Sequence, residues 1–307
     1  MLVRFLSYNI FMELFNDFNY NPKLAIALGF FDGVHLGHQK VIKSAVDFAK
    51  QQNTKSAVIT FKEHPCCIFY NVKPSYILKD SERRKQIENL GVDYLYEVDF
   101  KNLKDLTAKD YLEDILIKNF EPVSISTGFN HFFGSNKTGT PEFLEENQKK
   151  YGYTYIKTEP QHINDKLISS TYIRECLKNG DIKEVNLFLG RPFEIRGEVI
   201  HGLHLGATLG YKTANLDYPD NLIKIPYGAY KVTVNNKYNA VLNFGVKPTI
   251  TNISKPVLEA HILDFDKDIY GETISIQFKD FIRQEQKFNS KTELMEQIKK
   301  DIKKCTE

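Results

Sequence analysis

The sequence predicts an α/β domain, in which a parallel sheet carries helices on both faces, followed by an antiparallel β-barrel with a C-terminal helix. From residue 24 to about residue 186, short apolar runs alternate with amphipathic segments, as they do in parallel sheets. After Leu189-Gly-Arg-Pro192 the pattern changes to short β-rich runs separated by turn residues, which is typical of an antiparallel barrel. We therefore expect two domains, 1–186 and 187–307, and 307 residues suffice for two hydrophobic cores.

In the first domain, five apolar runs are expected to be strands: Leu24–Leu28, Ser56–Phe61, Tyr94–Val98, Val123–Ser126 and Tyr153–Lys157. Five amphipathic segments are expected to be helices: Val41–Phe48, Ser81–Leu90, Thr107–Phe120, Pro141–Lys150 and Ser169–Lys178. Ser81 is the candidate N-cap of its helix, Gly91 lies just past the end of that helix, and Pro122 stops the next one.

In the second domain, five runs are expected to be barrel strands: Phe193–His201, Tyr230–Val234, Ala240–Phe244, Val257–Leu263 and Thr273–Phe278. Asn235-Asn236 lies between two of these strands and is a hairpin signal. The segment Lys291–Lys304 is expected to be an amphipathic helix, because Leu294, Ile298 and Ile302 fall on one face.

Composition and charge exclude several classes of protein. The chain has 42% apolar and 26% charged residues, as ordinary globular proteins have. Residues 1–186 carry 24 basic and 24 acidic side chains, and the remainder carries 17 and 15, so neither half has the basic excess of a nucleic-acid-binding protein. No apolar run is long enough to span a bilayer, and the N-terminus does not resemble a signal peptide. The chain has four cysteines, Cys66, Cys67, Cys176 and Cys305, and they form no C-x-x-C pair. We therefore expect free thiols and a cytoplasmic protein.

The first predicted strand is followed by Gly29-Phe-Phe-Asp-Gly-Val-His-Leu-Gly-His38, which leads directly into a helical pattern. A helix N-terminus presents unpaired N–H groups and the positive end of the helix dipole, so it suits a phosphate group. Gly33 and Gly37 would let the backbone approach a ligand without a Cβ clash. His35 and His38 would share one face of the first turn and donate hydrogen bonds to a phosphate whose charge changes. The alternative is that both histidines merely cap the helix.

Three further segments are expected to meet this turn at the carboxyl ends of the strands: Thr60-Phe-Lys-Glu-His-Pro65, Gly128-Phe-Asn-His-Phe-Phe-Gly134 and Ile168-Ser-Ser-Thr-Tyr-Ile-Arg174. The Asn130 amide can both donate and accept hydrogen bonds. Ser169, Ser170 and Thr171 suit a helix N-terminus, and Arg174 can reach a phosphate with its planar guanidinium. Taken alone, this last segment is equally typical of a capped helix with an ordinary surface arginine.

In the second domain, Thr213 and Asn215 lie two residues apart in Leu209-Gly-Tyr-Lys-Thr-Ala-Asn-Leu216. On an extended segment both side chains face one side, and their oxygens suit Mg²⁺ alongside phosphate. Glu259 and His261 are expected to share one face of a strand. His201 and His204 are three residues apart, but no third ligand is evident, so we do not expect a metal site there.

The pattern Gly-x-Phe-Asp-Gly-Val-His-x-Gly-His resembles the nucleotide-binding turn of the bacterial bifunctional riboflavin kinase/FAD synthetase family. The Ser-Ser-Thr-x-Ile-Arg segment follows it in the order seen in that family. The second domain resembles riboflavin kinases in the order of its segments, among them Asn243-Phe-Gly-Val-Lys-Pro-Thr249, Leu258-Glu-Ala-His-Ile-Leu-Asp264 and Phe281-Ile-Arg-Gln-Glu285. The resemblance extends from about Leu24 to Ile302.

The resemblance implies that the first domain is a Rossmann-like nucleotidyltransferase, which joins FMN to the adenylyl group of ATP, and that the second domain phosphorylates riboflavin to FMN. The implied small-molecule partners are riboflavin, FMN and ATP, with Mg²⁺ as cofactor, and we favour a monomer. The implied catalytic residues are His35, His38, Arg174 and Glu259. In the first domain the implied binding residues are Gly29, Phe31, Asp32, Gly33, Asn130, Ser169, Ser170 and Thr171. In the kinase domain they are Gly206, Gly210, Lys212, Thr213 and Asn215, of which Thr213 and Asn215 would hold the metal.

The chain departs from the family pattern at a few positions. The family usually has an arginine at the position of Ala207 and a proline at that of Lys212, and Lys212 can replace the missing charge. Asn130 and His131 stand where an aspartate and a second aromatic are common. Two alternatives follow: an FAD synthetase with a degenerate kinase domain, or a flavin- or nucleotide-binding regulator without catalysis. Intact Thr213, Asn215 and Glu259 oppose the first alternative, and the intact histidine turn opposes the second.

Overall fold

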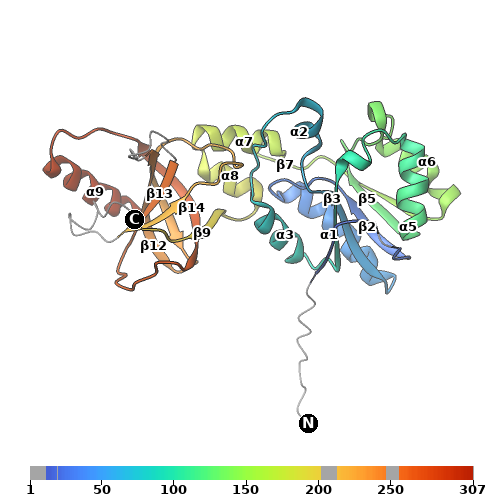
Figure 1. The fold of residues 1–307 in the computed structure, drawn as a ribbon, viewed down its shortest axis with the longest axis horizontal. Helices are drawn as coiled ribbons and strands as arrows, with labels where there is room; N and C mark the ends of the chain where they lie inside the picture. Colours follow the sequence, from blue (N-terminus) through green and yellow to red (C-terminus); the bar gives the residue numbers. More distant parts are fainter. Residues whose placement is uncertain (1–11, 19, 202–212, 247–255, 307) are drawn as a thin grey trace, which may run out of the picture. The chain divides into compact units, whose positions relative to one another are not determined.

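The chain forms two compact units in this computed structural model, which describes residues 12–18, 20–201, 213–246 and 256–306. Unit 1 consists of Met1–Pro74 and Asp80–Ile168, and unit 2 consists of Ser75–Lys79 and Ser169–Glu307 (Figure 1). Each unit has its own sheet. The domain boundary expected after residue 186 stays a prediction.

Unit 1 is built on six parallel strands: β1 (Glu13–Phe15), β2 (Leu24–Leu28), β3 (Lys55–Phe61), β4 (Tyr94–Val98), β5 (Ser124–Gly128) and β6 (Thr154–Thr158). Their order across the sheet is β1-β4-β3-β2-β5-β6, and every neighbouring pair is parallel. The five expected strands and the parallel sheet are therefore confirmed. β1 was not expected, because three residues carry no periodic signal. It forms one edge of the sheet and pairs with β4.

The helical segments of unit 1 are α1 (Leu36–Gln51), α2 (Pro65–Tyr70), α3 (Asp80–Glu88), η1 (Phe100–Asn102), α4 (Ala108–Asp110), η2 (Tyr111–Ile117), α5 (Lys118–Phe120), η3 (Ser135–Lys137) and α6 (Pro141–Tyr151). A two-residue hairpin follows β6, made of β7 (His162–Ile163) and β8 (Lys166–Leu167). The helix expected over residues 107–120 is confirmed as three consecutive helical segments, of which η2 is a π-helix.

Ser81 is not an N-cap, contrary to expectation. The helix α3 begins one residue earlier, at Asp80. The carboxylate of Asp80 lies 3.4 Å from the Arg83 guanidinium and complements the positive end of the helix, so Asp80 belongs to the first turn. Gly91, with φ +85°, does follow the helix end, and its N–H donates to the carbonyl of Glu88.

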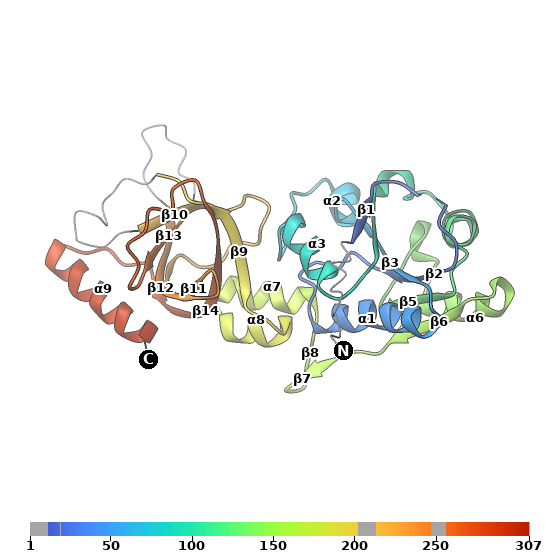
Figure 2. The same cartoon turned by 90° about the horizontal axis from the view of Figure 1, so that it is seen from below.

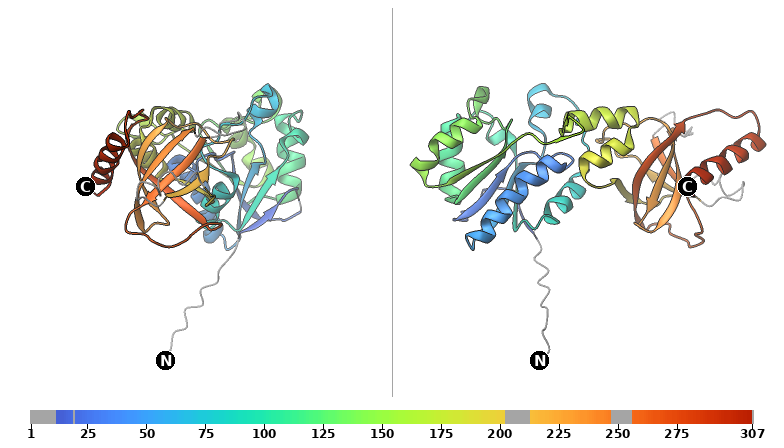
Figure 3. Two further views of the ribbon diagram at one scale, coloured as in Figure 1. Left: turned by 60° about the vertical axis from the view of Figure 1, so that its left-hand side comes forward. Right: turned by 180° about the vertical axis from the view of Figure 1, so that it is seen from behind.

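The sheet of unit 1 has helices on both faces (Figure 3). On one face, α1 buries an apolar stripe that includes Val41, Ile42 and Ala45. On the other face, alternate strand residues form a core with η2 and α6. It includes Leu24, Ile26 and Leu28 of β2, Leu112 and Leu116 of η2, and Leu144 of α6. Strands buried on both faces explain why β2 is apolar throughout.

Unit 2 begins with two helices, α7 (Ser170–Asn179) and α8 (Ile182–Leu189). Six strands follow: β9 (Phe193–Glu198), β10 (Thr213–Asp217), β11 (Gly228–Val234), β12 (Tyr238–Val246), β13 (Pro256–Ile262) and β14 (Thr273–Gln284). The last element is α9 (Lys291–Thr306). The helix α8 was not expected, because it follows α7 after only a short turn at Gly180.

The strands of unit 2 form an antiparallel sheet in the order β10-β13-β12-β11-β14-β9, which curls on itself (Figure 2). A bridge between Ile200 and Asn215 connects the chain just after β9 with β10, so it joins the two edges of the sheet. The expected hairpin at Asn235-Asn236 is confirmed, since both residues have the positive φ of a tight β-turn, 52° and 57°. The barrel and the C-terminal helix are thus confirmed.

No helix in the described ranges is long and apolar enough to cross a membrane. The four cysteines are free, as expected.

Candidate active sites

The turn between β2 and α1 is tight, and two of its non-glycine residues have left-handed backbone angles. Phe31 has φ +58° and Val34, which is β-branched, has φ +41°. L-residues adopt this conformation at a cost, and such strain concentrates at functional sites. Gly33 supplies φ +80° without that cost. A Cβ on Gly29 would lie 2.8 Å from the Phe31 ring, so only glycine fits there.

The two histidines of this turn lie together at the start of α1. His35 is the N-cap, and its Nδ1 accepts a hydrogen bond of 3.2 Å from the backbone N–H of His38. The two rings stack with centroids 3.5 Å apart and an angle of 17° between their planes. His35 is buried, and the ring of buried Phe31 packs edge-on against His38 at 5.4 Å. A Cβ on Gly37 would lie 3.2 Å from the His35 ring, which explains this glycine.

The capping interpretation of His35 is confirmed, and it is compatible with phosphate binding. A ring nitrogen that accepts a hydrogen bond carries no proton, so the cap assigns the proton of His35 to Nε2. Capping therefore uses Nδ1, and the proton of the ring lies on Nε2. The two roles that the sequence presented as alternatives belong to different atoms of one ring.

The segment Thr60–Pro65 meets the turn, as expected. The Thr60 hydroxyl donates to the carbonyl of Phe30 at 3.1 Å. The His64 ring contacts the Phe30 ring edge-on, with centroids 4.7 Å apart, and its Nδ1 caps α2 by accepting from the N–H of Cys66. The carboxyl ends of β2 and β3 are therefore linked through Phe30.

The segment after β5 also lies beside α1. A Cβ on Gly128 would come 3.6 Å from Asn130 Oδ1 and 4.0 Å from a methyl group of Val41. Asn130 is exposed, so its amide is accessible. The adjacent His131 has a buried Nε2 atom with no hydrogen-bond partner among the described residues, and burial lowers the pKa of His131 to about 4. His131 is therefore neutral at physiological pH.

Arg174 and the serines before it belong to unit 2. Ser169 is the N-cap of α7, and its hydroxyl accepts from the N–H of Tyr172 at 3.2 Å. Ser170 and Thr171 form the first turn, and Arg174 Nε donates to the carbonyl of Ser75 at 3.0 Å. The histidine turn belongs to unit 1, so the meeting of this segment with the histidines stays a prediction.

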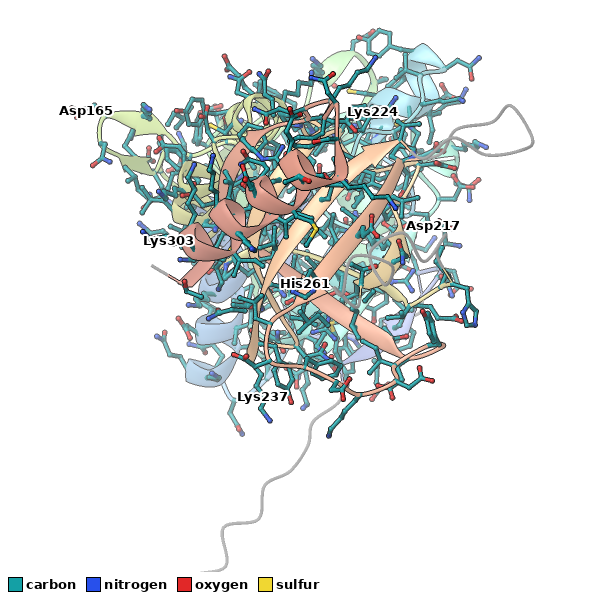
Figure 4. The ribbon with its side chains drawn as sticks, turned by 90° about the vertical axis from the view of Figure 1, so that its left-hand side faces the viewer. Asp165, Asp217, Lys224, Lys237, His261 and Lys303 are labelled. Atoms are coloured by element: carbon teal, nitrogen blue, oxygen red, sulfur yellow. The ribbon has the colours of Figure 1, made fainter. Side chains whose placement is uncertain are left out.

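A second set of predicted residues lies on β10 and β13. The two strands pair with Asn215 opposite Glu259 and Thr213 opposite His261. The Thr213 hydroxyl donates to Glu259 Oε1 at 3.0 Å, and Asn215 is 3% exposed. Glu259 and His261 alternate with the buried Leu258, Ala260 and Ile262, so they share the outer face of the sheet, where Figure 4 labels His261 and Asp217.

A cavity of about 330 Å³ adjoins these strands within unit 2. Thr213, Asn215 and Ile262 line it, together with Val199 and the loop of residues 265–270. This loop connects β13 to β14, and in it Tyr270 stacks on the His201 ring with centroids 4.0 Å apart. Thr213 both lines the cavity and binds Glu259, so the cavity lies next to the carboxylate.

The loop residues Phe265, Asp266, Lys267 and Asp268 line this cavity and were not expected from the sequence. The available signal was a run of charged residues at the end of the strand that carries Glu259. Some expected residues of the kinase domain lie outside the described part of the chain. They are the nucleotide-binding candidates Gly206, Gly210 and Lys212, and Ala207, which departs from the family pattern. The described residues contain no group of three or more His, Cys, Asp or Glu side chains that could hold a metal.

Comparisons with known proteins agree with this arrangement. The family model described as FAD synthetase matches residues 17–172, and the one described as riboflavin kinase matches residues 189–307. A bifunctional riboflavin kinase/FMN adenylyltransferase of Bacillus subtilis is 38% identical over 91% of this chain and 90% of its own. A protein of the same name from Escherichia coli K12 is 31% identical over 90% of each chain.

A solved structure has the same fold over almost the entire chain. The crystal structure described as a macrolide-efflux protein from Streptococcus pneumoniae superposes with a TM-score of 0.84. It is 33% identical and covers 95% of this chain and 98% of its own. With the two family models and the relatives that span both units, these similarities show that the chain belongs to the bifunctional riboflavin kinase/FMN adenylyltransferase family.

Proposed function

We propose that the histidine turn of unit 1 carries out the adenylylation of FMN and that Thr213, Asn215 and Glu259 of unit 2 carry out the phosphorylation of riboflavin. The two activities follow from family membership. The observation that carries the assignment of residues is the stacked pair His35/His38 at the start of α1, with a hydrogen-bond donor at His35 Nε2.

In adenylyl transfer, an oxygen of the FMN phosphate attacks the α-phosphorus of ATP. The bond from the α-phosphorus to the oxygen bridging to the β-phosphate breaks, and pyrophosphate leaves with the electron pair. No covalent enzyme intermediate is needed, so the protein contributes positioning and charge stabilisation. His35 Nε2–H and the His38 ring stabilise the transferring phosphoryl oxygens, the N–H groups of the first turn of α1 bind phosphate, and Arg174 holds the pyrophosphate.

In the kinase reaction, the 5′-hydroxyl of the ribityl chain attacks the γ-phosphorus of ATP, and ADP leaves. Glu259 takes the proton of this hydroxyl as the new bond forms. The Thr213 hydroxyl, which donates to Glu259 Oε1, fixes the orientation of the carboxylate. The cavity beside Thr213 and Asn215 accommodates the phosphate end of ATP.

Thr213 and Asn215 fit the Mg²⁺ that such kinases use. Both offer uncharged oxygen atoms, which this hard cation binds. The Thr213 hydroxyl directs its hydrogen at Glu259, so its lone pairs face elsewhere, and Asn215 is buried on the same side of β10. When bound there, the ion would neutralise phosphate charge.

A cytoplasmic location belongs to this proposal. The support is that all four cysteines are free, as they are in a reducing compartment.

The experiment is to incubate the purified chain with Mg²⁺-ATP and riboflavin and to separate the flavins by chromatography. The proposal predicts FMN first and FAD later. Unchanged riboflavin with FAD formed from added FMN would reject the kinase assignment and favour the degenerate-kinase alternative. No product from either flavin would reject both assignments and favour a non-catalytic binding protein.

A further inference from the structure

Arg83 is a buried arginine of α3 that reaches three strands of the unit 1 sheet. Its side chain is 2% exposed. Nη1 donates to the carbonyl of Phe30, just after β2, and Nη2 donates to the carbonyl of Phe61, at the end of β3, each at 3.1 Å. Nη2 also lies 3.1 Å from Glu97 Oε1 on β4. All three contacts are at the carboxyl-end edge of the sheet, where ligands bind in such folds.

Phe30 is the residue through which Arg83 reaches the histidine turn. The Arg83 guanidinium lies 4.5 Å from the centroid of the Phe30 ring, and the His64 ring packs against the same side chain. The Phe30 carbonyl accepts from both Arg83 and Thr60. The next residue, Phe31, has the left-handed φ that begins the strained turn. A strained turn persists only where surrounding contacts fix it, and these contacts fix its first residue.

The burial of Arg83 is costly for the fold. Its ion-pair partner Glu97 is 1% exposed, and Arg83 Nε is buried without a hydrogen-bond partner in the described part of the chain. Replacing such a buried pair by apolar side chains is often neutral or stabilising, so stability alone does not account for it. A planar guanidinium can hold two backbone carbonyls and a carboxylate in one fixed arrangement, which an apolar side chain cannot do.

We propose that Arg83 is a positioning residue for FMN adenylylation. It holds the carbonyls of Phe30 and Phe61 so that the turn presents His35 and His38 to the transferring phosphate. Arg83 touches neither substrate and acts through Phe30. The inference rests on the proposed function, since it assumes that these histidines meet the phosphate.

The test compares Arg83→Lys and Arg83→Met with Arg84→Met. Arg84 is the matched control, because it binds the other oxygen of Glu97 (Nε to Oε2 2.8 Å) from the exposed side of α3. Each variant is assayed for the kcat and KM of FAD formation. Circular dichroism and thermal unfolding report whether unit 1 is folded, and riboflavin phosphorylation by the same preparation reports the activity of unit 2. Arg83→Lys keeps a positive charge opposite Glu97, so it remains informative if Arg83→Met does not fold.

We expect Arg83→Lys to lower the kcat of FAD formation about 10-fold and Arg83→Met about 100-fold, the order of loss that a small misplacement of reacting groups produces. Riboflavin phosphorylation stays within about twofold, and Arg84→Met stays close to wild type. FAD formation by Arg83→Lys within about twofold of wild type would overturn the inference, as would equal losses in Arg84→Met or in riboflavin phosphorylation. Wild-type protein that makes no FAD from FMN would instead refute the proposed function, and the inference with it.

Discussion

The Nδ1 atom of His35 accepts a hydrogen bond from the backbone N–H of His38, and the two imidazole rings stack with their centroids 3.5 Å apart. One side chain thus caps the helix and fixes its own tautomer. The helix start is the feature that binds phosphate, and the same contact orients Nε2–H as a donor.

Capping and chemistry at His35 can be separated by two substitutions. Asparagine is a good N-cap but has no atom at the position of Nε2, whereas alanine removes both functions. We expect His35→Asn to keep the unfolding midpoint of wild type and to lower FAD formation by about 100-fold, the usual effect of losing one such donor. His35→Ala loses the same activity and in addition about 1 kcal/mol of stability. Steady-state assays and thermal unfolding measure the two effects, and full activity in His35→Asn would contradict the role of Nε2.

His38→Ala should abolish FAD formation from FMN and leave the fold intact. His38 contributes only its backbone N–H to the cap, which alanine retains. Riboflavin phosphorylation by the same protein is the control, because Glu259 and Thr213 lie in the other unit. Unchanged FAD formation by this variant would remove His38 from the mechanism.

Glu259→Gln should abolish the kinase reaction selectively. The glutamine side-chain oxygen can still accept from Thr213, but it cannot take a proton from the ribityl hydroxyl. We expect riboflavin phosphorylation to fall by about 100-fold to 10,000-fold, the usual contribution of a general base. FAD formation from supplied FMN should not change. A matched Thr213→Ser variant, which keeps the hydroxyl, should retain most kinase activity, and a wild-type rate in Glu259→Gln would exclude it as the base.

His131 makes the stability of unit 1 dependent on pH. Burial lowers its pKa from 6.5 to about 4. The unfolded chain therefore binds a proton at His131 below pH 6.5, whereas the folded chain binds it only near pH 4. The stability that neutral His131 maintains is therefore complete above pH 6.5 and is lost as the pH falls toward 4. Between pH 7.5 and pH 5, this difference amounts to about 2 kcal/mol.

His131→Phe removes this titration and suits a site next to the Phe133 ring. We expect the unfolding free energy of the variant, measured in denaturant by circular dichroism, to fall less between pH 7.5 and pH 5 than that of wild type. His162→Gln is the control for the loss of a histidine elsewhere in unit 1, because His162 is exposed on β7. Equal pH dependence in His131→Phe and wild type would show that the surroundings of His131 do not lower its pKa.

Asp301 anchors α9 to the barrel. Its buried carboxylate accepts from Nε and Nη2 of Arg283 on β14, with distances of 3.0 and 2.8 Å to Oδ2. Asp301→Ala leaves the arginine without its partner, and we expect a loss of about 3 kcal/mol. Lys183→Ala, which breaks the exposed pair with Asp280, should cost less than about 1 kcal/mol. Thermal unfolding checks both, and equal effects would contradict the role of burial.

The fold could be predicted largely because periodicity and turn chemistry are local. The uniformly apolar Leu24–Leu28 and the hairpin at Asn235-Asn236 carry their structure in their own sequence. β1 and α8 lacked such a signal, since three residues show no period and α8 follows α7 after a short turn. Ser81 failed as an N-cap because Asp80 pairs with Arg83, which propensity alone does not report.

The candidate sites followed the same rule. The residues of the histidine turn are contiguous, so their pattern was readable. Thr213 was singled out by its spacing to Asn215, and the role of Glu259 came from the resemblance to a known family. Arg83 and the loop of residues 265–270 were not found, because an arginine in a polar helix and a charged loop resemble solvent-exposed segments. Arg83 is distinguished only by its hydrogen bond to the Phe30 carbonyl, and the loop of residues 265–270 only by the cavity that it lines beside Thr213.

The chain transfers two different groups of ATP, the adenylyl group to FMN and the γ-phosphoryl group to riboflavin. The most direct test supplies ATP labelled at the α-phosphorus together with FMN, and ATP labelled at the γ-phosphorus together with riboflavin, and measures the label in each purified flavin. We expect α-label in FAD and γ-label in FMN, with His38→Ala losing the first and Glu259→Gln losing the second. Label that enters neither flavin, or that both variants lose together, would exclude two separate sites.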